Sequence, residues 1–401
     1  YYDPAVMDPM NPALLVERIN VPVFIAGAWQ DEQTGGRFPG LIPRFTSAPH
    51  VFATLSNGLH TEALGMGTLQ RFYEFLDLYV AQRVPGLRGL ANLIPTVLYN
   101  AIFAASGIWF PPERFTGMTY DEAKAAYESE PAVRVLLEEG AAEGLNPGSP
   151  VPRFTEEFTT WPIPGTVATP LPLTHRGGRV TYAYNPDATP DTFYSGSLED
   201  IWKANVTWDW KPAPKGAVVA FESAALKADQ VLIGSASADL WVTSTTPDTD
   251  IEVTITEVRP DGNEVYVQSG WLRASHRALD AAASTDLRPA HTHTEADAAD
   301  LPAGEFTPVR VELFPFAHPF RAGSRIRITV DAPGNARGEW EFRTISGGET
   351  VDIAYGGDHP SRVVLPVVPV TIAAPAPAAC GALRGQPCRT FVPAHNEVAL
   401  K

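Results

Sequence analysis

The sequence has little cysteine and a shortage of positive charge, and each shortage excludes a class of protein. Its only cysteines are Cys380 and Cys388, with no Cys/His set at zinc spacing, so no structural metal site is expected. Lys and Arg total 30 against 46 Asp and Glu, and the net charge of −16 argues against nucleic acid as a partner. The two cysteines predict either a small disulfide loop, as in exported proteins, or two unpaired thiols.

No leader peptide and no uninterrupted membrane span can be recognised. The chain begins Tyr-Tyr-Asp without Met, so we expect a processed or partial product whose N-terminus cannot show a signal peptide. The possible disulfide is the basis for expecting an extracellular or periplasmic location. Residues 89–112 carry no charge, but Pro95 and two asparagines interrupt them and no basic cluster flanks them, which argues against a transmembrane span. This stretch predicts either a lid-like helical pair or ordinary buried core.

Two apolar strands and a helix predict an α/β arrangement in the first part of the chain. Residues 12–31 contain a short amphipathic helix and then a strand at 21–26, and a second strand lies at 50–55. Strands that are apolar on both faces are typical of a parallel sheet covered by helices. Thr68 is placed to cap the helix that follows. The expected inward face of that helix is Leu69, Phe72, Tyr73, Leu76 and Val80.

From residue 131 onward, short β-like runs dominate the sequence. Proline accounts for 38 of 401 residues, which disfavours long helices. The runs are separated by Pro, Gly, Asp and Asn, and they predict a β-sandwich or jelly roll. They are VRVLL, RVTYAY, AVVAF, DLWVTS, IEVTITEV, EVYVQSGWL, PVRVELF, RIRITV and RVVLPV. Residues 372–401 predict a weakly structured tail.

Asp31 and His60 are the candidate catalytic residues, because each follows one of the two apolar strands. Functional groups collect at the carboxyl ends of strands in open α/β sheets, so both are expected at one edge. An acid followed by a histidine is the order of the last two members of a hydrolase triad. There the acid orients the imidazole, and the imidazole removes the proton of the nucleophile. The spacing alone leaves open a pair of solvated loop residues.

Several sequence motifs occur together along the chain. Residues 219–277 contain FES-x-x-L, LWV-x-S, PDTD, V-x-PDG and G-x-LRA-x-x-R, and further motifs lie at 312–330 and 359–369. With residues 11–31 and the TWP at 160–162, they resemble the CocE/NonD serine hydrolases. This family includes cocaine-esterase-like and X-prolyl dipeptidyl-peptidase-like enzymes. The similarity covers most of the chain.

The resemblance implies a fold class of α/β plus all-β. Residues 1–166 would be the C-terminal portion of an α/β-hydrolase domain, with a lid-like helical insertion at about 86–130. Residues 167–371 would form a jelly-roll β-sandwich, and 372–401 a Pro/Ala-rich tail. The family also implies that the candidate pair are the triad acid and the triad base, and that neither a cofactor nor a metal is needed.

The chain departs from the family in lacking a nucleophile motif. No G-x-S-x-G sequence, which would place a serine on a tight turn, occurs in the 401 residues. Gly196-Ser197 and Gly234-Ser235 lack the second glycine and fall in the expected β-domain. We therefore expect the nucleophile in an N-terminal hydrolase segment, on a separate chain or elsewhere in the protein, unless it is absent. The turn before His60, NGLH, also lacks the tryptophan that the family tends to have.

The function predicted is a serine hydrolase that cleaves ester or amide bonds, X-Pro peptide bonds among them, through an acyl-enzyme. This chain would supply Asp31 and His60, and an N-terminal partner segment would supply the nucleophile. The substrate would be a small ester or amide, hydrophobic if residues 89–112 form a lid. The sequence leaves open whether the chain forms a homo-oligomer. The alternative is a non-catalytic protein whose β-sandwich binds carbohydrate or a partner and whose acid–histidine pair is inert.

Two further clusters have simpler explanations. His291 and His293 lie in an acidic, alanine-rich loop without a third metal ligand, so a solvated loop is expected. Trp202, Trp208 and Trp210 either form a platform for a sugar or pack against an edge of the sandwich, and packing is the expectation.

Overall fold

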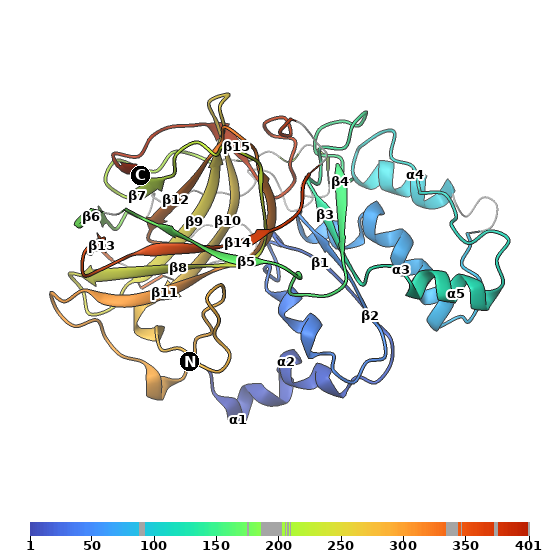
Figure 1. Cartoon of the computed structure of the whole chain (residues 1–401), viewed down its shortest axis with the longest axis horizontal. Helices are drawn as coiled ribbons and strands as arrows, with labels where there is room; N and C mark the ends of the chain where they lie inside the picture. Colours follow the sequence, from blue (N-terminus) through green and yellow to red (C-terminus); the bar gives the residue numbers. More distant parts are fainter. Residues whose placement is uncertain are drawn as a thin grey trace.

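The computed structural model describes residues 1–87, 93–174, 176–185, 203–204, 206, 208, 210–333, 344–345, 347–372 and 376–399. Gly196-Ser197, Trp202 and residues 88–92 lie outside this description. A four-stranded sheet with helices on its outer side lies beside a sandwich of two six-stranded sheets (Figure 1). No helix in the described ranges is long and apolar enough to cross a membrane.

The smaller sheet contains the two strands that precede the candidate pair. Its order is β1 (Val23–Ala28), β2 (Val51–Ser56), β3 (Val133–Leu137) and β4 (Phe154–Phe158). The strands β1, β2 and β3 are parallel, and β4 is antiparallel to β3. The run VRVLL was therefore wrongly assigned to the sandwich, because it forms β3. A short run that is buried on both faces fits either kind of sheet.

Both faces of the smaller sheet are covered, which explains why its strands are apolar throughout. On the outer face, Phe52 packs with Phe75 and Leu78 of α3 (Met66–Tyr79) and with Tyr127 of α5 (Tyr120–Glu128). On the inner face, a second cluster joins the sheet to the sandwich. It comprises Trp29, Ile42, Ala53, Leu55, Val133, Val135, Leu137, Ile163, Val231, Ile233, Ala317, Val368 and Ile372. Each large side chain buried in this way contributes about 1.5–3 kcal/mol.

The predicted inward face of α3 is wrong at two positions. Leu76 and Val80 are exposed, at 38% and 72%. The buried stripe includes Arg71 instead, whose guanidinium donates to the carbonyl oxygens of Ala53 and Pro131 at 3.0 and 2.7 Å. A charged side chain that finds carbonyl acceptors can be buried, so the helix is rotated relative to the apolar pattern.

The remaining helices are short. Near the N-terminus, α1 (Pro4–Met7) and α2 (Pro12–Leu15) precede β1, and α4 (Leu93–Ile102) follows α3. Thr119 and Glu122 form a reciprocal capping box at the start of α5. The helices α3, α4 and α5 lie on the side of the smaller sheet that faces away from the sandwich (Figure 1).

The sandwich contains all the predicted runs except VRVLL. One sheet has the order β15-β10-β9-β12-β7-β16. Its strands are β7 (Val219–Glu222), β9 (Asp250–Val258), β10 (Asn263–Arg273), β12 (Arg325–Asp331), β15 (Cys388–Thr390) and β16 (Asn396–Ala399). The other has the order β5-β14-β8-β13-β6, with β11 also paired to β8. Its strands are β5 (Val167–Pro172), β6 (Gly178–Ala183), β8 (Gln230–Ser244), β11 (Thr307–Phe320), β13 (Thr350–Tyr355) and β14 (Arg362–Val368).

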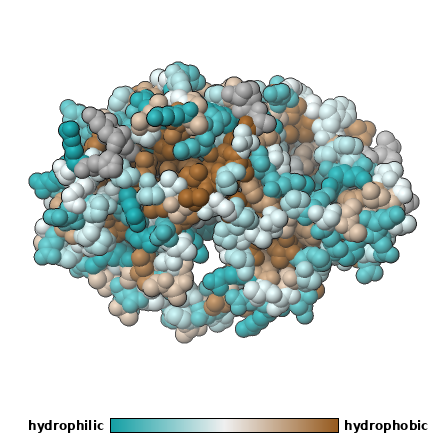
Figure 2. Space-filling model, in the orientation of Figure 1, coloured by the Kyte–Doolittle hydropathy of each residue, from teal (hydrophilic) through white to brown (hydrophobic). Residues whose placement is uncertain are grey.

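The two sheets of the sandwich enclose the largest hydrophobic core of the described residues. They approach closely at Gly270 of β10, where an added Cβ would lie 1.8 Å from the carbonyl oxygen of Glu312 in β11. A side chain at this position would force the sheets apart. Some hydrophobic surface remains outside the core, and Figure 2 shows it gathered near the middle of this view, over the sandwich strands.

The tail is better ordered than its composition predicts. Within the described residues 376–399, β15 pairs with β10 and β16 pairs with β7, so both strands extend the first sheet of the sandwich. Cys380 and Cys388 form a disulfide, with their Cα atoms 5.4 Å apart. The expectation of a weakly structured tail is therefore wrong, because strand pairing and a disulfide loop compensate for the lack of large apolar side chains.

Candidate active site

The structure brings Asp31 and His60 together at the carboxyl ends of β1 and β2. The Oδ2 atom of Asp31 lies 2.8 Å from Nδ1 of His60. The two strands are adjacent and parallel, with Ala28 paired to Ser56, so the loops that follow them leave the sheet on the same side. The acid is buried and the imidazole is partly exposed, with its side chain 39% accessible.

The loop that carries Asp31 is folded around the aspartate itself. Its Oδ1 atom accepts hydrogen bonds from the backbone N–H groups of Gln33 and Thr34, both at 2.8 Å. The carboxylate therefore has one oxygen committed to the loop and the other directed at the imidazole. Gly36 allows the chain to turn back here, because an added Cβ would lie 2.5 Å from the carbonyl oxygen of Trp29.

His60 is the first residue of a 3₁₀ turn, His60–Leu64, and its backbone is held by a second acid. Its N–H donates to Oε2 of Glu32 at 3.1 Å, one residue after Asp31. With Asp31 accepting from Nδ1, the neutral ring carries its proton on Nδ1 and presents Nε2 as an acceptor. Within the described part of the chain no side chain hydrogen-bonds to Nε2. The arrangement can therefore accept a proton from a group placed outside this chain's described residues.

Buried charges lie beneath this turn, and none of them was predicted from the sequence. The guanidinium of Arg384 pairs with the carboxylate of Glu62, and both side chains are almost fully buried. Glu139 is also buried nearby, and its burial, together with the negative charge of Glu62, raises the pKa of its carboxyl well above the usual value. Burial therefore favours the neutral form of the Glu139 carboxyl. Arg384 is 322 residues from Glu62, so no local pattern could reveal the pair.

Part of the uncharged stretch forms α4, and the described residues of the stretch have two different faces. Tyr99, Phe103 and Ile108 are buried and pack around Met66, the first residue of α3. The Cζ atom of Arg384 lies 5.5 Å from the centre of the Phe103 ring, so this face of α4 adjoins the charges beneath His60. The opposite face is exposed, and it consists of Leu93, Ile94, Val97, Leu98 and Ile102, with Trp109 beyond the end of the helix. The stretch is thus core on one side and open apolar surface on the other.

Among the described residues of the two lesser clusters, His291 and Trp210 are explained by burial and packing. Burial lowers the pKa of His291 to about 4, so its ring is neutral at physiological pH. In the parts of the chain that the structure describes, no group of three or more His, Cys, Asp or Glu is arranged to hold a metal ion. Trp210 borders a pocket of about 370 Å³ on the sandwich, but the guanidinium of Arg389 lies 3.9 Å from its ring centre and Tyr266 contacts it edge-on. Packing explains Trp210.

Comparison with solved structures shows which proteins share this fold. The CocE/NonD family hydrolase of Staphylococcus aureus aligns with 88% of this chain and 56% of its own, with a TM-score of 0.60 and 19% identity. An aminopeptidase of a marine-sediment Thaumarchaeota archaeon aligns with 89% of this chain and 56% of its own, with a TM-score of 0.58 and 14% identity. At these identities the likeness shows the fold alone. The chain is thus CocE/NonD-like, which confirms the resemblance found in its sequence.

A family model identifies the particular family. The model described as X-Pro dipeptidyl-peptidase C-terminal non-catalytic domain matches residues 125–342, more than half of the chain, and the chain belongs to this family. A Mycobacterium bovis protein described as a candidate serine esterase is 28% identical over 256 residues, which are 57% of this chain and 39% of that protein. The cocaine esterase of a Rhodococcus species is 25% identical over 242 residues, 52% of this chain and 39% of that enzyme.

These comparisons limit what the family match says about the candidate site. The chain spans about two fifths of the length of the curated relatives it matches. Asp31 and His60 precede the family match at 125–342, and the disulfide loop follows it. Support for the roles of Asp31 and His60 therefore comes from the geometry of this chain and not from the family match.

Proposed function

We propose that this chain is the C-terminal part of a serine hydrolase that cleaves ester or amide bonds. The observation that carries the proposal is the 2.8 Å contact between Asp31 and His60 at the ends of two adjacent parallel strands. The serine esterase and cocaine esterase relatives support the same class of reaction. The disulfide supports an extracellular or periplasmic location.

In the proposed mechanism, His60 exchanges protons with a serine from the N-terminal segment. As the serine oxygen attacks the carbonyl carbon, its proton passes to Nε2 of His60, and the carboxylate of Asp31 stabilises the imidazolium. The imidazolium then protonates the leaving alcohol or amine, which departs and leaves an acyl-enzyme. Water attacks the acyl group, His60 accepts the proton of the water, and that proton returns to the serine as the acid is released.

The smaller sheet supports this assignment as the end of a larger α/β-hydrolase sheet. Among the described strands, β1 pairs only with β2, so its other edge is open to a further strand. An unpaired edge of a buried parallel sheet exposes backbone donors and acceptors that natural proteins usually cover. The N-terminal segment that carries the serine would cover it. On this assignment residues 1–166 end the hydrolase domain and 167–371 form a jelly roll.

A serine-directed probe tests the proposed reaction. The complete protein, incubated with a fluorophosphonate, should gain one covalent phosphonyl group and lose its hydrolysis of p-nitrophenyl acetate in parallel, because phosphonylation blocks the nucleophile. Intact mass and peptide mapping locate the label. Hydrolysis that continues after stoichiometric labelling would contradict a serine mechanism.

The exposed face of α4 supports a hydrophobic acyl or aromatic substrate. Leu98 and its neighbours form open apolar surface on a helix whose other face adjoins the charges beneath His60. Apolar surface next to a reaction site favours apolar ligands. We propose that this face acts as a lid over the substrate when the N-terminal segment is in place.

Two substitutions, one on α4 and one at the residue directly after it, separate a lid from plain core. Leu98→Gln should lower kcat/KM for long-chain or aromatic esters at an unchanged melting temperature, because Leu98 is 51% exposed and contributes little to the core. The matched control is Phe103→Ala, which should cost about 3–5 kcal/mol of stability, because Phe103 is 2% exposed. Steady-state kinetics with a series of acyl chain lengths measures the effect. Equal losses for acetate and long-chain esters in the Leu98 variant would rule out the lid.

A further inference from the structure

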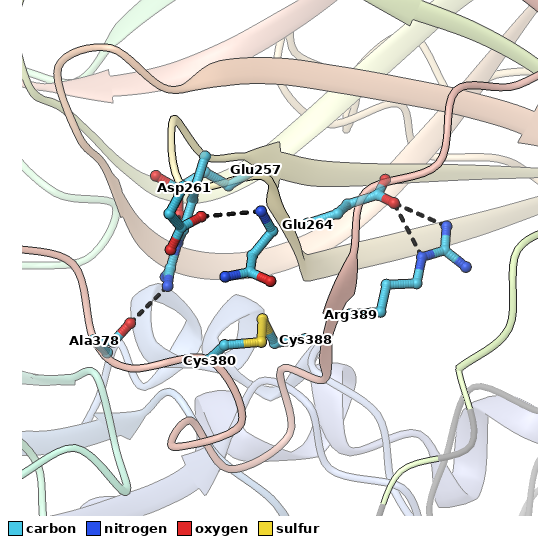
Figure 3. The surroundings of a disulfide bond; sticks show 9 residues. Glu257, Asp261, Glu264, Ala378, Cys380, Cys388 and Arg389 are labelled. Carbon is cyan, nitrogen blue, oxygen red and sulfur yellow. Dashed lines mark hydrogen bonds and ion pairs between the residues drawn. A yellow bond between two sulfur atoms is a disulfide. The ribbon is translucent and has the colours of Figure 1, made fainter.

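A disulfide-closed loop of the tail reaches back to the turn that carries His60. Its two ends are anchored in the sandwich: the carbonyl oxygen of Ala378 accepts from Nη1 of Arg259 at 2.6 Å, and Cys388 begins β15, which pairs with β10. Figure 3 shows Ala378 and Arg389 on either side of the disulfide, close to the ends of β9 and β10. The loop between the cysteines is therefore closed covalently and fixed at both ends.

Arg384 lies inside this loop, and each of its three guanidinium nitrogens donates at least one hydrogen bond. It pairs with Glu62 through Nε, donates through Nη1 to the carbonyl oxygens of Lys203 and Gly148 at 2.7 and 3.1 Å, and donates through Nη2 to Oγ1 of Thr61 at 3.3 Å. The side chain is 1% exposed. A buried guanidinium is stable only with such a complete set of acceptors.

The Glu62 carboxylate holds the residues on both sides of His60. Its Oε2 atom accepts the backbone N–H of Leu59, and its Oε1 atom accepts the hydroxyl of Thr61 at 2.8 Å. Because Glu62 is fully buried, its negative charge depends on Arg384 for compensation. Arg384 thus acts on the histidine through a single carboxylate that fixes the turn.

Gln386 provides a second contact between the same loop and this turn. Its Oε1 atom accepts from Nδ2 of Asn57 at 2.5 Å, and Oδ1 of Asn57 accepts the backbone N–H of Glu139 at 3.2 Å. Gly385 allows the close approach: its φ is +73°, and an added Cβ would lie 2.7 Å from Cβ of Gln30. The tip of the loop is therefore shaped to fit beneath β1 and β2.

We propose that Arg384 is a positioning residue for His60 and that the Cys380–Cys388 disulfide keeps it in place; for catalysis, the proposal rests on the hydrolase function proposed above. Without the guanidinium, the buried Glu62 carboxylate loses its counter-charge and releases the turn from Leu59 to Glu62. The imidazole then leaves the geometry in which its Nδ1 faces Asp31. Misplacement of a general base by about 1 Å lowers kcat by about 10²-fold, whereas substrate binding is little affected.

Hydrogen exchange tests the positioning role in the 401-residue chain without any need for turnover. Arg384→Gln should raise amide exchange at residues 57–62 by about tenfold or more, while the sandwich strands remain protected. Arg389→Gln is the matched control, since it removes a partly buried Arg–Glu pair of the same tail, to Glu264 at 2.9 Å, on the sandwich. It should leave 57–62 unchanged. Unchanged exchange at 57–62 in R384Q would overturn the proposal.

Reduction of the disulfide provides a second perturbation that requires no substitution. Cys380 is exposed, so a phosphine reductant reaches it in the folded chain. Reduction should raise amide exchange at residues 57–62, as R384Q does. Because it needs no substitution, it tests the proposal even if the R384Q variant does not fold. Thiol mapping shows when reduction is complete. If amide protection at residues 57–62 is then the same as before reduction, the disulfide has no part in holding Arg384 in place.

Kinetics of the complete protein link this position to the reaction. Arg384→Gln should lower kcat by about 10²-fold with KM little changed, and Arg384→Lys should recover part of the loss, because it restores the charge without the planar fork. If the unchanged protein hydrolyses no ester while the exchange results hold, the hydrolase function fails and the positioning of the turn survives. If the unchanged protein is active and R384Q keeps its kcat, the positioning role is wrong.

Discussion

His60→Ala should lower the kcat of the complete protein by about 10⁴-fold, and Asp31→Asn should cost a similar factor. The alanine removes the group whose Nε2 accepts the proton of the nucleophile. The asparagine keeps the shape of the acid but can donate to Nδ1, so the neutral ring would carry its proton on Nε2 and could no longer act as a base. Initial rates with p-nitrophenyl acetate, together with circular dichroism of each variant, measure the effect.

His50→Ala is a suitable control for this experiment. His50 precedes β2 at the end opposite to His60, where its Nε2 lies 3.1 Å from the carboxylate of Glu128. Its loss removes an imidazole beside the far end of β2 without touching the candidate site, so kcat should stay within about twofold. Turnover near the unchanged level in either the His60 or the Asp31 variant, with the fold intact, would show that the pair is not catalytic.

Local rules predicted that Asp31 and His60 lie at the same edge of the sheet, and the resemblance to the family implied that they act as a pair. Each residue lies in the loop after a short run that is apolar on both faces, and these two runs form adjacent strands of a covered parallel sheet. The run VRVLL obeys the same rule, yet its place beside β2 was missed because it stands in a sequence crowded with sandwich strands. Burial on both faces fits a parallel strand and a sandwich strand alike, so the place of this run depends on its pairing with β2, which the sequence does not show.

The support of His60 was not predictable, because it depends on contacts between distant parts of the chain. Arg384 and Gln386 lie in a segment rich in Pro, Ala and Gly, whose composition indicates disorder. They become buried only when the disulfide and β15 bring the loop beneath β2. A buried arginine leaves no periodic signal in the sequence, and neither does the buried acid Glu139. The same limit explains α3, where Arg71 replaces Leu76 on the buried side.

The 401-residue chain alone should hydrolyse no ester, and addition of an N-terminal segment with the nucleophile should restore turnover. The sequence contains no G-x-S-x-G elbow, and a serine attacks efficiently only where a base and an oxyanion site surround it. The open edge of β1 provides the place where a further parallel strand would join the sheet. That strand would bring a serine at its carboxyl end to the edge where His60 presents Nε2.

Mixing the separately purified segment and chain measures this dependence directly. Turnover should appear only in the mixture and should rise with the concentration of the segment until the chain is saturated, because the nucleophile and the base come from different pieces. A mixture made with the His60→Ala chain should stay inactive, which excludes a contaminating esterase in either preparation. If the 401-residue chain by itself is a stable monomer that turns over p-nitrophenyl acetate, and the His60→Ala change abolishes that turnover, the nucleophile must lie within residues 1–401 and the proposed division of the triad is wrong.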